Sequence, residues 1–222
     1  MSWPVIAAVA LAATAAGVWC ARWLGTQGYR YDDERDLPTR RSGWVAVLVP
    51  VLVVLVVLAW PKEPVAVVYA AATVVLVVLA AIDLDVLRLP DKLTIPLAVG
   101  VVVSLLVVAL IADDIDSWVR AVLAGVALGV FYLVLVLLRS GTGMGLGDAK
   151  LAPSLGMLLG FQSWSHVILG TVVSFVLAAV AALYLVLFTG ARRDSHIAFG
   201  PYLLAGTVLM LIAPVIGSLL GM

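Results

Sequence analysis

The sequence predicts an all-α protein, a polytopic transmembrane helix bundle with about eight membrane segments and no sizeable soluble domain. Of its 222 residues, 64% are hydrophobic and 12% are charged, and the mean hydropathy is +1.21. A soluble domain is nearer half apolar and a quarter charged. The apolar residues form runs of about 20, the length that crosses a bilayer as a helix, and the charges gather in short islands between the runs. We therefore expect an integral membrane protein.

The apolar runs define the expected helices in order. We predict membrane spans near residues 3–24, 44–60, 64–82, 94–112, 118–138, 149–161, 164–188 and 199–221. Tryptophans at the ends of these runs are typical of residues that anchor a helix at the membrane interface, namely Trp3, Trp44, Trp60, Trp118 and Trp164. The sixth run is short, so its helix is expected to borrow residues from the Phe161–Trp164 turn or to lie partly inside the bundle.

The basic residues predict the orientation of the spans. With the N-terminus outside, one set of loops holds eleven basic residues, and the other holds only Lys62 and Arg120. The larger set comprises Arg22, Arg30, Arg35, Arg40, Arg41, Arg88, Lys92, Arg139, Lys150, Arg192 and Arg193. Basic loops remain cytoplasmic, so the N-terminus is expected outside. No basic residue precedes the first run, which favours an uncleaved first helix over a signal peptide.

Composition excludes several kinds of site. The net charge of zero offers nothing for nucleic acid, and the single Cys20 excludes an internal disulfide and a multi-cysteine zinc site. His166 and His196 have no neighbours that imply metal, so no metal or cofactor is expected. The polar loop Gly25–Ser42 is too short for a folded domain. Its acidic residues could attract a basic ligand, although the interleaved Arg30 and Arg35 weaken that field.

Two aspartates at the edges of apolar runs are the candidate functional residues. Asp83 ends the third run, and Asp148 opens the sixth, so both are expected at the same cytoplasmic depth. Ionisable groups at membrane depth are costly and mark functional sites. Two carboxylates that meet in a helix bundle suggest acid–base chemistry. The alternative for Asp83 is a charged connector broken by Pro90. Asp85 and Asp91 are expected to be solvated loop charges rather than catalysts.

Asp148 follows a glycine-rich segment, residues 141–148. The segment is no dinucleotide fingerprint, because the Gly-x-Gly-x-x-Gly spacing fails and no strand precedes it. Alternate glycines allow a substrate strand to approach the backbone closely. Met144 could contact an apolar substrate, but a role in filling the gap beside the glycines is favoured. The alternative is a flexible turn in which Asp148 caps the next helix.

Together these segments resemble the signatures of type IV prepilin peptidases. Asp83 with the trailing Leu-Pro-Asp-Lys-Leu-Thr, and Gly145-Leu-Gly-Asp-Ala-Lys-Leu151, are similar to the two motifs of that family, and Ala198-Phe-Gly-Pro-Tyr202 is similar to a third. The Gly-x-Gly-Asp motif alone is also similar to presenilin and signal peptide peptidases. The resemblance covers roughly residues 64–210.

The resemblance implies an intramembrane aspartyl endopeptidase of the bacterial cytoplasmic membrane, which removes basic leaders from pilin-like precursors at the cytoplasmic face. The matched catalytic residues are Asp83 and Asp148, and the matched substrate-binding residues are Gly145, Gly147 and Lys150. The implied partners are a prepilin-like substrate, with a basic leader and an apolar helix, and the lipid bilayer.

The expected organisation is a first helix with a charged loop, residues 1–43, and a peptidase core, residues 44–222. Longer family members carry an insert with paired cysteines, associated with N-methylation, after the first span. Gly25–Ser42 contains no cysteine, so we expect a short, peptidase-only form. The alternative class is a transporter, or a scaffold of a pilus or secretion assembly, that uses its acids to bind ions.

Overall fold

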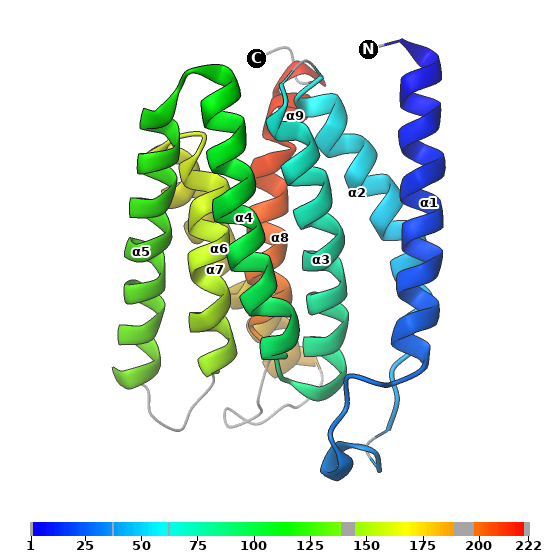
Figure 1. Cartoon of the computed structure of the whole chain (residues 1–222). Coiled ribbons are helices and arrows are strands. Elements are labelled where there is room, and N and C mark those ends of the chain that lie inside the picture. The colour runs from blue at the N-terminus through cyan, green and yellow to red at the C-terminus, as the bar shows by residue number, and fades with distance from the viewer. Residues whose placement is uncertain (1, 37, 62, 139–144, 189–197, 220–222) are drawn as a thin grey trace. The chain divides into compact units, whose positions relative to one another are not determined.

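The structure is a computed structural model that describes residues 2–36, 38–61, 63–138, 145–188 and 198–219. Within these ranges its regular elements are all helices, which confirms the predicted fold class (Figure 1). They are α1 (Trp3–Gly25), a 3₁₀ helix η1 (Asp32–Glu34), α2 (Val45–Ala59), α3 (Val65–Val86), α4 (Asp91–Ala112), α5 (Ile115–Leu138), α6 (Leu146–Gly160), α7 (Trp164–Phe188), α8 (Gly200–Leu211) and α9 (Ala213–Leu219).

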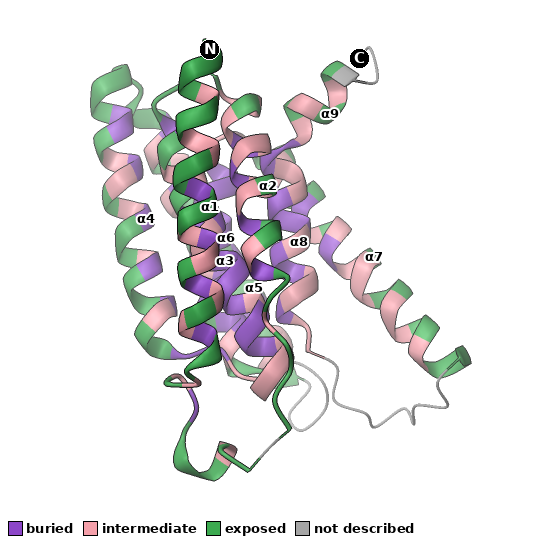
Figure 2. Cartoon of the chain, turned by 90° about the vertical axis from the view of Figure 1, so that its right-hand side faces the viewer, coloured by how far each residue is buried: buried purple, intermediate pink, exposed green. Residues whose placement is uncertain are grey.

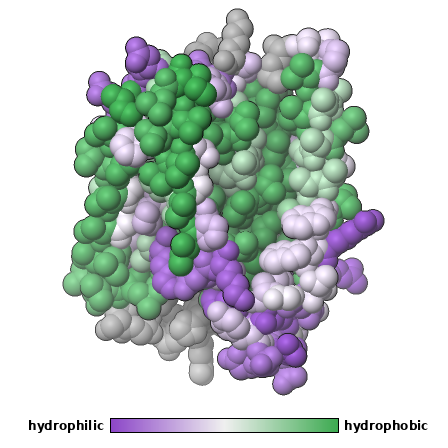
Figure 3. All heavy atoms as spheres, viewed as in Figure 1, coloured by the Kyte–Doolittle hydropathy of each residue, from purple (hydrophilic) through white to green (hydrophobic). Residues whose placement is uncertain are grey.

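Five of these helices, α1, α3, α4, α5 and α7, are long and apolar enough to cross a membrane. The helices α2 and α8 are apolar but shorter. Side chains on the outer surfaces of α4 and α5 are hydrophobic along most of each helix (Figure 3). Such surfaces suit contact with lipid, because a soluble protein rarely exposes large continuous apolar patches.

Prolines move two of the predicted boundaries. The fourth helix begins at Asp91, earlier than predicted, because Pro90 ends the preceding segment and is the N-cap of α4. The predicted span 199–221 is two helices, α8 and α9, so the single long span was wrong. Pro214 explains this break, because it has no N–H to donate to the carbonyl of Met210 and its ring crowds that carbonyl.

The chain divides into two compact units, which we describe separately. The first comprises Met1–Val86 and Leu211–Met222, and the second comprises Leu87–Met210. In the first unit, α2 packs against α1, α3 and α9. Gly17 of α1 lies so close to α2 that an added Cβ would be 3.1 Å from the carbonyl oxygen of Ala46. The indole of Trp60 donates a hydrogen bond of 2.8 Å to the Leu211 carbonyl.

In the second unit, α6 is the central helix and packs against α4, α5 and α7. Every residue from Ser154 to Gly160 is buried (Figure 2). The prediction that the sixth helix lies inside the bundle is therefore correct. The alternative, that it borrows residues from the Phe161–Trp164 turn, is wrong, because α6 ends at Gly160 and gains its extra residues at its beginning.

Small residues allow α5 and α6 to approach closely. An added Cβ on Gly129 would lie 2.8 Å from Cγ of Pro153, and one on Gly125 would lie 2.7 Å from Cγ of Met157. At the C-terminal end of α6, Arg120 of α5 donates hydrogen bonds to the carbonyls of Gly160, Phe161 and Gln162, at 2.8, 2.7 and 3.1 Å. These bonds satisfy carbonyl groups that a helix end leaves without partners.

Candidate active site

Asp83 lies on α3, which extends beyond the predicted end of the third span to Val86. Asp83 therefore lies within the helical segment, three residues before its end, and is only 5% exposed. Burial of a carboxyl group is costly unless it is hydrogen-bonded or paired with a charge. A buried acid near the end of a mostly apolar helix is thus a marked feature of the first unit.

Asp85, two residues further along α3, forms a buried cluster with the polar loop. Arg30 donates to Oδ2 of Asp85 through Nε at 2.9 Å and through Nη2 at 2.7 Å, and the hydroxyl of Tyr29 donates to the same oxygen at 2.7 Å. The backbone N–H of Arg40 donates to Oδ1 at 2.9 Å. Exposure of the Arg30 and Asp85 side chains is 0% and 4%. The expectation that Asp85 is a solvated loop charge was wrong.

This cluster fixes the loop between α1 and α2 to the end of α3. Arg30 also donates to backbone carbonyls of Glu34 and Pro38, at 3.2 and 3.4 Å. Burial, together with the hydrogen bond to Asp85, raises the pKa of Tyr29 to about 12. Tyr29, Arg30 and Arg40 therefore attach the described part of this loop to α3.

The same pairing changes the interpretation of the loop charges. The side chain of Arg30 is buried and paired with Asp85, whereas Arg35 pairs with Asp32 on the surface at 3.1 Å. Only Arg35 of the two interleaved arginines is thus placed to weaken the acidic field. Attraction of a basic ligand by this loop stays a prediction.

Asp148 lies in the first turn of α6, in the second unit, and is 5% exposed. Its Oδ2 accepts a hydrogen bond of 3.2 Å from the backbone N–H of Gly145, the N-cap residue. A carboxylate in this position is stabilised by the positive end of the helix dipole. The capping contact that the sequence suggested is therefore present, and it also holds the carboxyl group in place.

The two matched glycines differ in how closely they are packed. A Cβ added to Gly147 would lie 3.1 Å from Cβ and 3.4 Å from the backbone nitrogen of Leu89. A Cβ added to Gly145 would meet nothing closer than the Gly147 nitrogen at 3.7 Å. A side chain at 147 would thus crowd Leu89, whereas packing alone does not require a glycine at 145.

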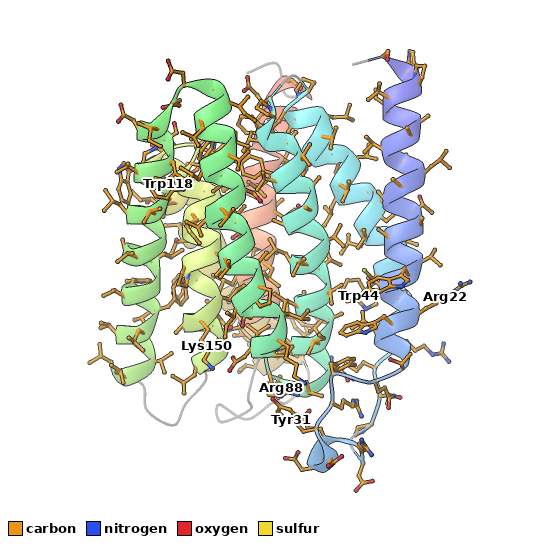
Figure 4. All side chains as sticks on the ribbon, viewed as in Figure 1. Arg22, Tyr31, Trp44, Arg88, Trp118 and Lys150 are labelled. Carbon is orange, nitrogen blue, oxygen red and sulfur yellow. The ribbon has the colours of Figure 1, made fainter. Side chains whose placement is uncertain are left out.

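Lys150 connects the same two segments through an ion pair. It lies near the beginning of α6 (Figure 4), and its Nζ donates to both carboxylate oxygens of Asp91 at 2.8 and 2.9 Å. Asp91 is the first residue of α4, and both side chains are about half exposed. The Leu-Pro-Asp segment that follows Asp83 is therefore bound to the Gly-Asp segment by packing and by charge.

An aromatic cluster in the second unit was missed by the sequence analysis. Tyr132 of α5 stacks on Phe175 of α7, with ring centroids 6.0 Å apart and an interplanar angle of 11°. Phe199 lies 6.2 Å from Tyr132 and 5.3 Å from Phe175. The Phe-Gly-Pro motif thus packs onto α5 through its first residue. The only signal in the sequence was the Phe131-Tyr132 pair within a run of valine and leucine.

The five matched site residues fall in both units. Asp83 belongs to the first unit, and Gly145, Gly147, Asp148 and Lys150 belong to the second. The meeting of the two carboxylates therefore stays a prediction. Gly141, Gly143, Met144 and His196 lie outside the described residues. Among the residues that are described, no group of three or more histidine, cysteine or acidic side chains has the arrangement of a metal site.

Comparison with known proteins gives one family and a group of named relatives. The type IV leader peptidase family matches residues 70–187, more than half of the chain. A prepilin leader peptidase/N-methyltransferase of Aeromonas hydrophila is 36% identical over 140 residues, which cover 63% of this chain and 47% of the relative. Proteins of the same name from Stutzerimonas stutzeri and Legionella pneumophila are 34% and 33% identical over 138 and 144 residues, each covering 61% of this chain and 46% of the relative.

The chain thus spans about half the length of the curated relatives it matches. No solved structure matches it significantly.

Proposed function

Because the chain belongs to the type IV leader peptidase family, we propose that it is a membrane-embedded aspartyl endopeptidase that cleaves the basic leader from prepilin-like precursors. The proposed catalytic residues are Asp83 and Asp148. Gly145, Gly147 and Lys150 are proposed to bind the substrate beside them. The apolar helices and the family together indicate that the chain is an integral membrane protein.

One observation carries the assignment of the site. Leu89 packs on Gly147, and Asp91 pairs with Lys150. These contacts join the segment that begins six residues after Asp83 to the turn that holds Asp148. They support a site built from both signatures, as two-carboxylate catalysis requires.

The chemistry follows from two carboxyl groups that share one proton, because both cannot ionise at close range without a large electrostatic cost. The ionised aspartate takes a proton from a water molecule while the water oxygen attacks the scissile carbonyl. The protonated aspartate donates a hydrogen bond to the oxygen that gains negative charge. The C–N bond then breaks as the carbonyl forms again, and the aspartate that took the proton from water gives it to the leaving nitrogen. The pair titrates as a unit, so neither role belongs to one residue at rest.

Charge supports the proposed orientation. Eleven basic residues lie in the loops that would face the cytoplasm and two in those that would face outside. In this orientation Asp83 and Asp148 are at the cytoplasmic side of the bacterial cytoplasmic membrane, where leaders arrive. Gly25–Ser42 contains no cysteine, which favours peptidase activity without methyl transfer. We propose that the chain consists of a first helix with a charged loop, residues 1–43, and a peptidase core, residues 44–222, which carries both proposed catalytic aspartates.

The test is leader removal from a candidate prepilin co-expressed with the chain. We expect cleavage by the wild type and by an Asp116→Asn control, because Asp116 is an exposed residue in the first turn of α5 and belongs to neither signature. We expect no cleavage by Asp83→Asn or Asp148→Asn, since each removes one of the two carboxyl groups. The mass of the pilin and its new N-terminal residue are the measurements. Normal processing by both variants would refute the aspartyl mechanism.

A further inference from the structure

The hydroxyl group of Tyr132 is a buried polar group that the fold does not use. The residue is 0% exposed, and its oxygen has no hydrogen-bond partner within the described part of the chain. A buried polar group without a partner destabilises the folded state, so it needs an explanation. The hydroxyl of Ser154 is also unpaired, but a change of rotamer can bring it to a carbonyl of its own helix. A tyrosine oxygen is too far from its helix for that.

The register of α5 and α6 places Tyr132 level with the turn that holds Asp148. Gly125 faces Met157, and Gly129 faces Pro153. The two helices are therefore antiparallel, so a residue four positions later in α5 lies opposite a residue four positions earlier in α6. Three residues beyond Gly129, Tyr132 comes opposite Lys150, and Asp148 is in the same helical turn.

The surrounding rings hold the phenol in place. Tyr132 stacks on Phe175, meets Phe131 edge to face at a centroid distance of 5.3 Å, and contacts Phe199 of the Phe-Gly-Pro motif. A phenylalanine at position 132 would make the same ring contacts without an unpaired hydroxyl. The packing therefore accounts for the ring and leaves the hydroxyl unexplained.

We propose that Tyr132 is a third catalytic residue, whose hydroxyl donates a hydrogen bond to the carbonyl oxygen of the scissile peptide as that carbon becomes tetrahedral. This inference rests on the proposed function. A donor held rigidly in a buried site stabilises developing negative charge strongly, because it needs no reorganisation during the reaction. The phenol keeps its proton throughout, and the two aspartates carry out the proton transfers.

The test is Tyr132→Phe, which removes one oxygen and keeps the ring. We expect its thermal unfolding in detergent at the temperature of the wild type or higher, because an unpaired buried group is gone. We expect kcat for leader cleavage to fall on the order of 100-fold with KM nearly unchanged, because the hydrogen bond forms in the transition state. Tyr184→Phe is the matched control, since Tyr184 is an exposed residue of α7, and it should behave as the wild type.

Each other outcome is decisive. Cleavage by Tyr132→Phe at the wild-type rate would refute the role of Tyr132 and leave the proposed function intact. Unfolding of Tyr132→Phe at a clearly lower temperature would show that the hydroxyl stabilises the fold, which also overturns the inference. A wild-type chain that leaves the prepilin uncut, or an Asp148→Asn variant that still cuts it, would refute the proposed function itself.

Discussion

Replacement of Gly156 by alanine should force α5 and α6 apart. Gly156 lies in the buried half of α6, facing the backbone of α5. An added Cβ would be 2.6 Å from the carbonyl oxygen of Ala124, 2.8 Å from Cα of Gly125 and 2.9 Å from the carbonyl carbon of Ala124. All three atoms belong to a helix backbone, so no change of rotamer relieves the contact.

The size of the effect follows from these distances. Restoring an ordinary contact of 3.4 Å requires the helices to separate by about 0.8 Å, and overpacking of this kind costs about 1–3 kcal/mol. The upper half of this range applies, because only backbone movement makes room. Gly100→Ala is the matched control, since nothing lies within 4 Å of an added Cβ there. Alanine in the middle of α4 should stabilise the helix by about 0.5–1 kcal/mol.

The assay is unfolding in mild detergent titrated with a denaturing detergent, followed by the circular dichroism of the helices. We expect a lower midpoint than the wild type for Gly156→Ala and an equal or higher midpoint for Gly100→Ala. Leader cleavage should fall with Gly156→Ala, because α6 also carries Asp148. Equal midpoints for Gly156→Ala and the wild type would contradict the close packing of α5 on α6.

Three further substitutions test packing and charge pairing in the segments that carry Asp83 and Asp148. Gly147→Ala should lower leader cleavage, because its Cβ would press on Leu89 at 3.1 Å, whereas Gly145→Ala should fold normally. Cleavage is measured with purified variants of equal helix content. Equal activity of Gly147→Ala and the wild type would argue against the contact. Arg30→Met should lower the free energy of unfolding by about 3 kcal/mol, because Asp85 would stay buried without its guanidinium. The same detergent titration measures this loss, and an unchanged midpoint would exclude a structural role for the pair.

The helical elements were predictable because each depends on residues adjacent in the chain. Apolar runs of sufficient length predicted all five helices that are long enough to span a membrane. The start of α4 and the break between α8 and α9 differ from the prediction because Pro90 and Pro214 restrict the local backbone. The resemblance of the motifs indicated the family that residues 70–187 match. The assignment of Asp83 and Asp148 as catalysts is a proposal that mutation must test.

Asp85 shows why charges were harder to interpret. Its sequence context, a polar connector after an apolar run, gave no reason to expect burial. The structure brings Arg30, 55 residues away, onto its carboxylate. Tyr132 and Phe199 likewise meet across α5 and the start of α8. Such pairings depend on how whole segments pack, and no local pattern reports them.

By itself, the sequence determined that this chain is helical and lies in a membrane, because the transfer of apolar side chains into lipid is a property of each residue and adds up along a run. Only the tertiary structure decided that Leu89 and Asp91 meet Gly147 and Lys150, and that the phenol of Tyr132 is buried level with the turn of Asp148. The physical reason is that these contacts join residues from different segments of the chain. The level of Tyr132 with the turn of Asp148 follows from the close approach that glycines permit between α5 and α6.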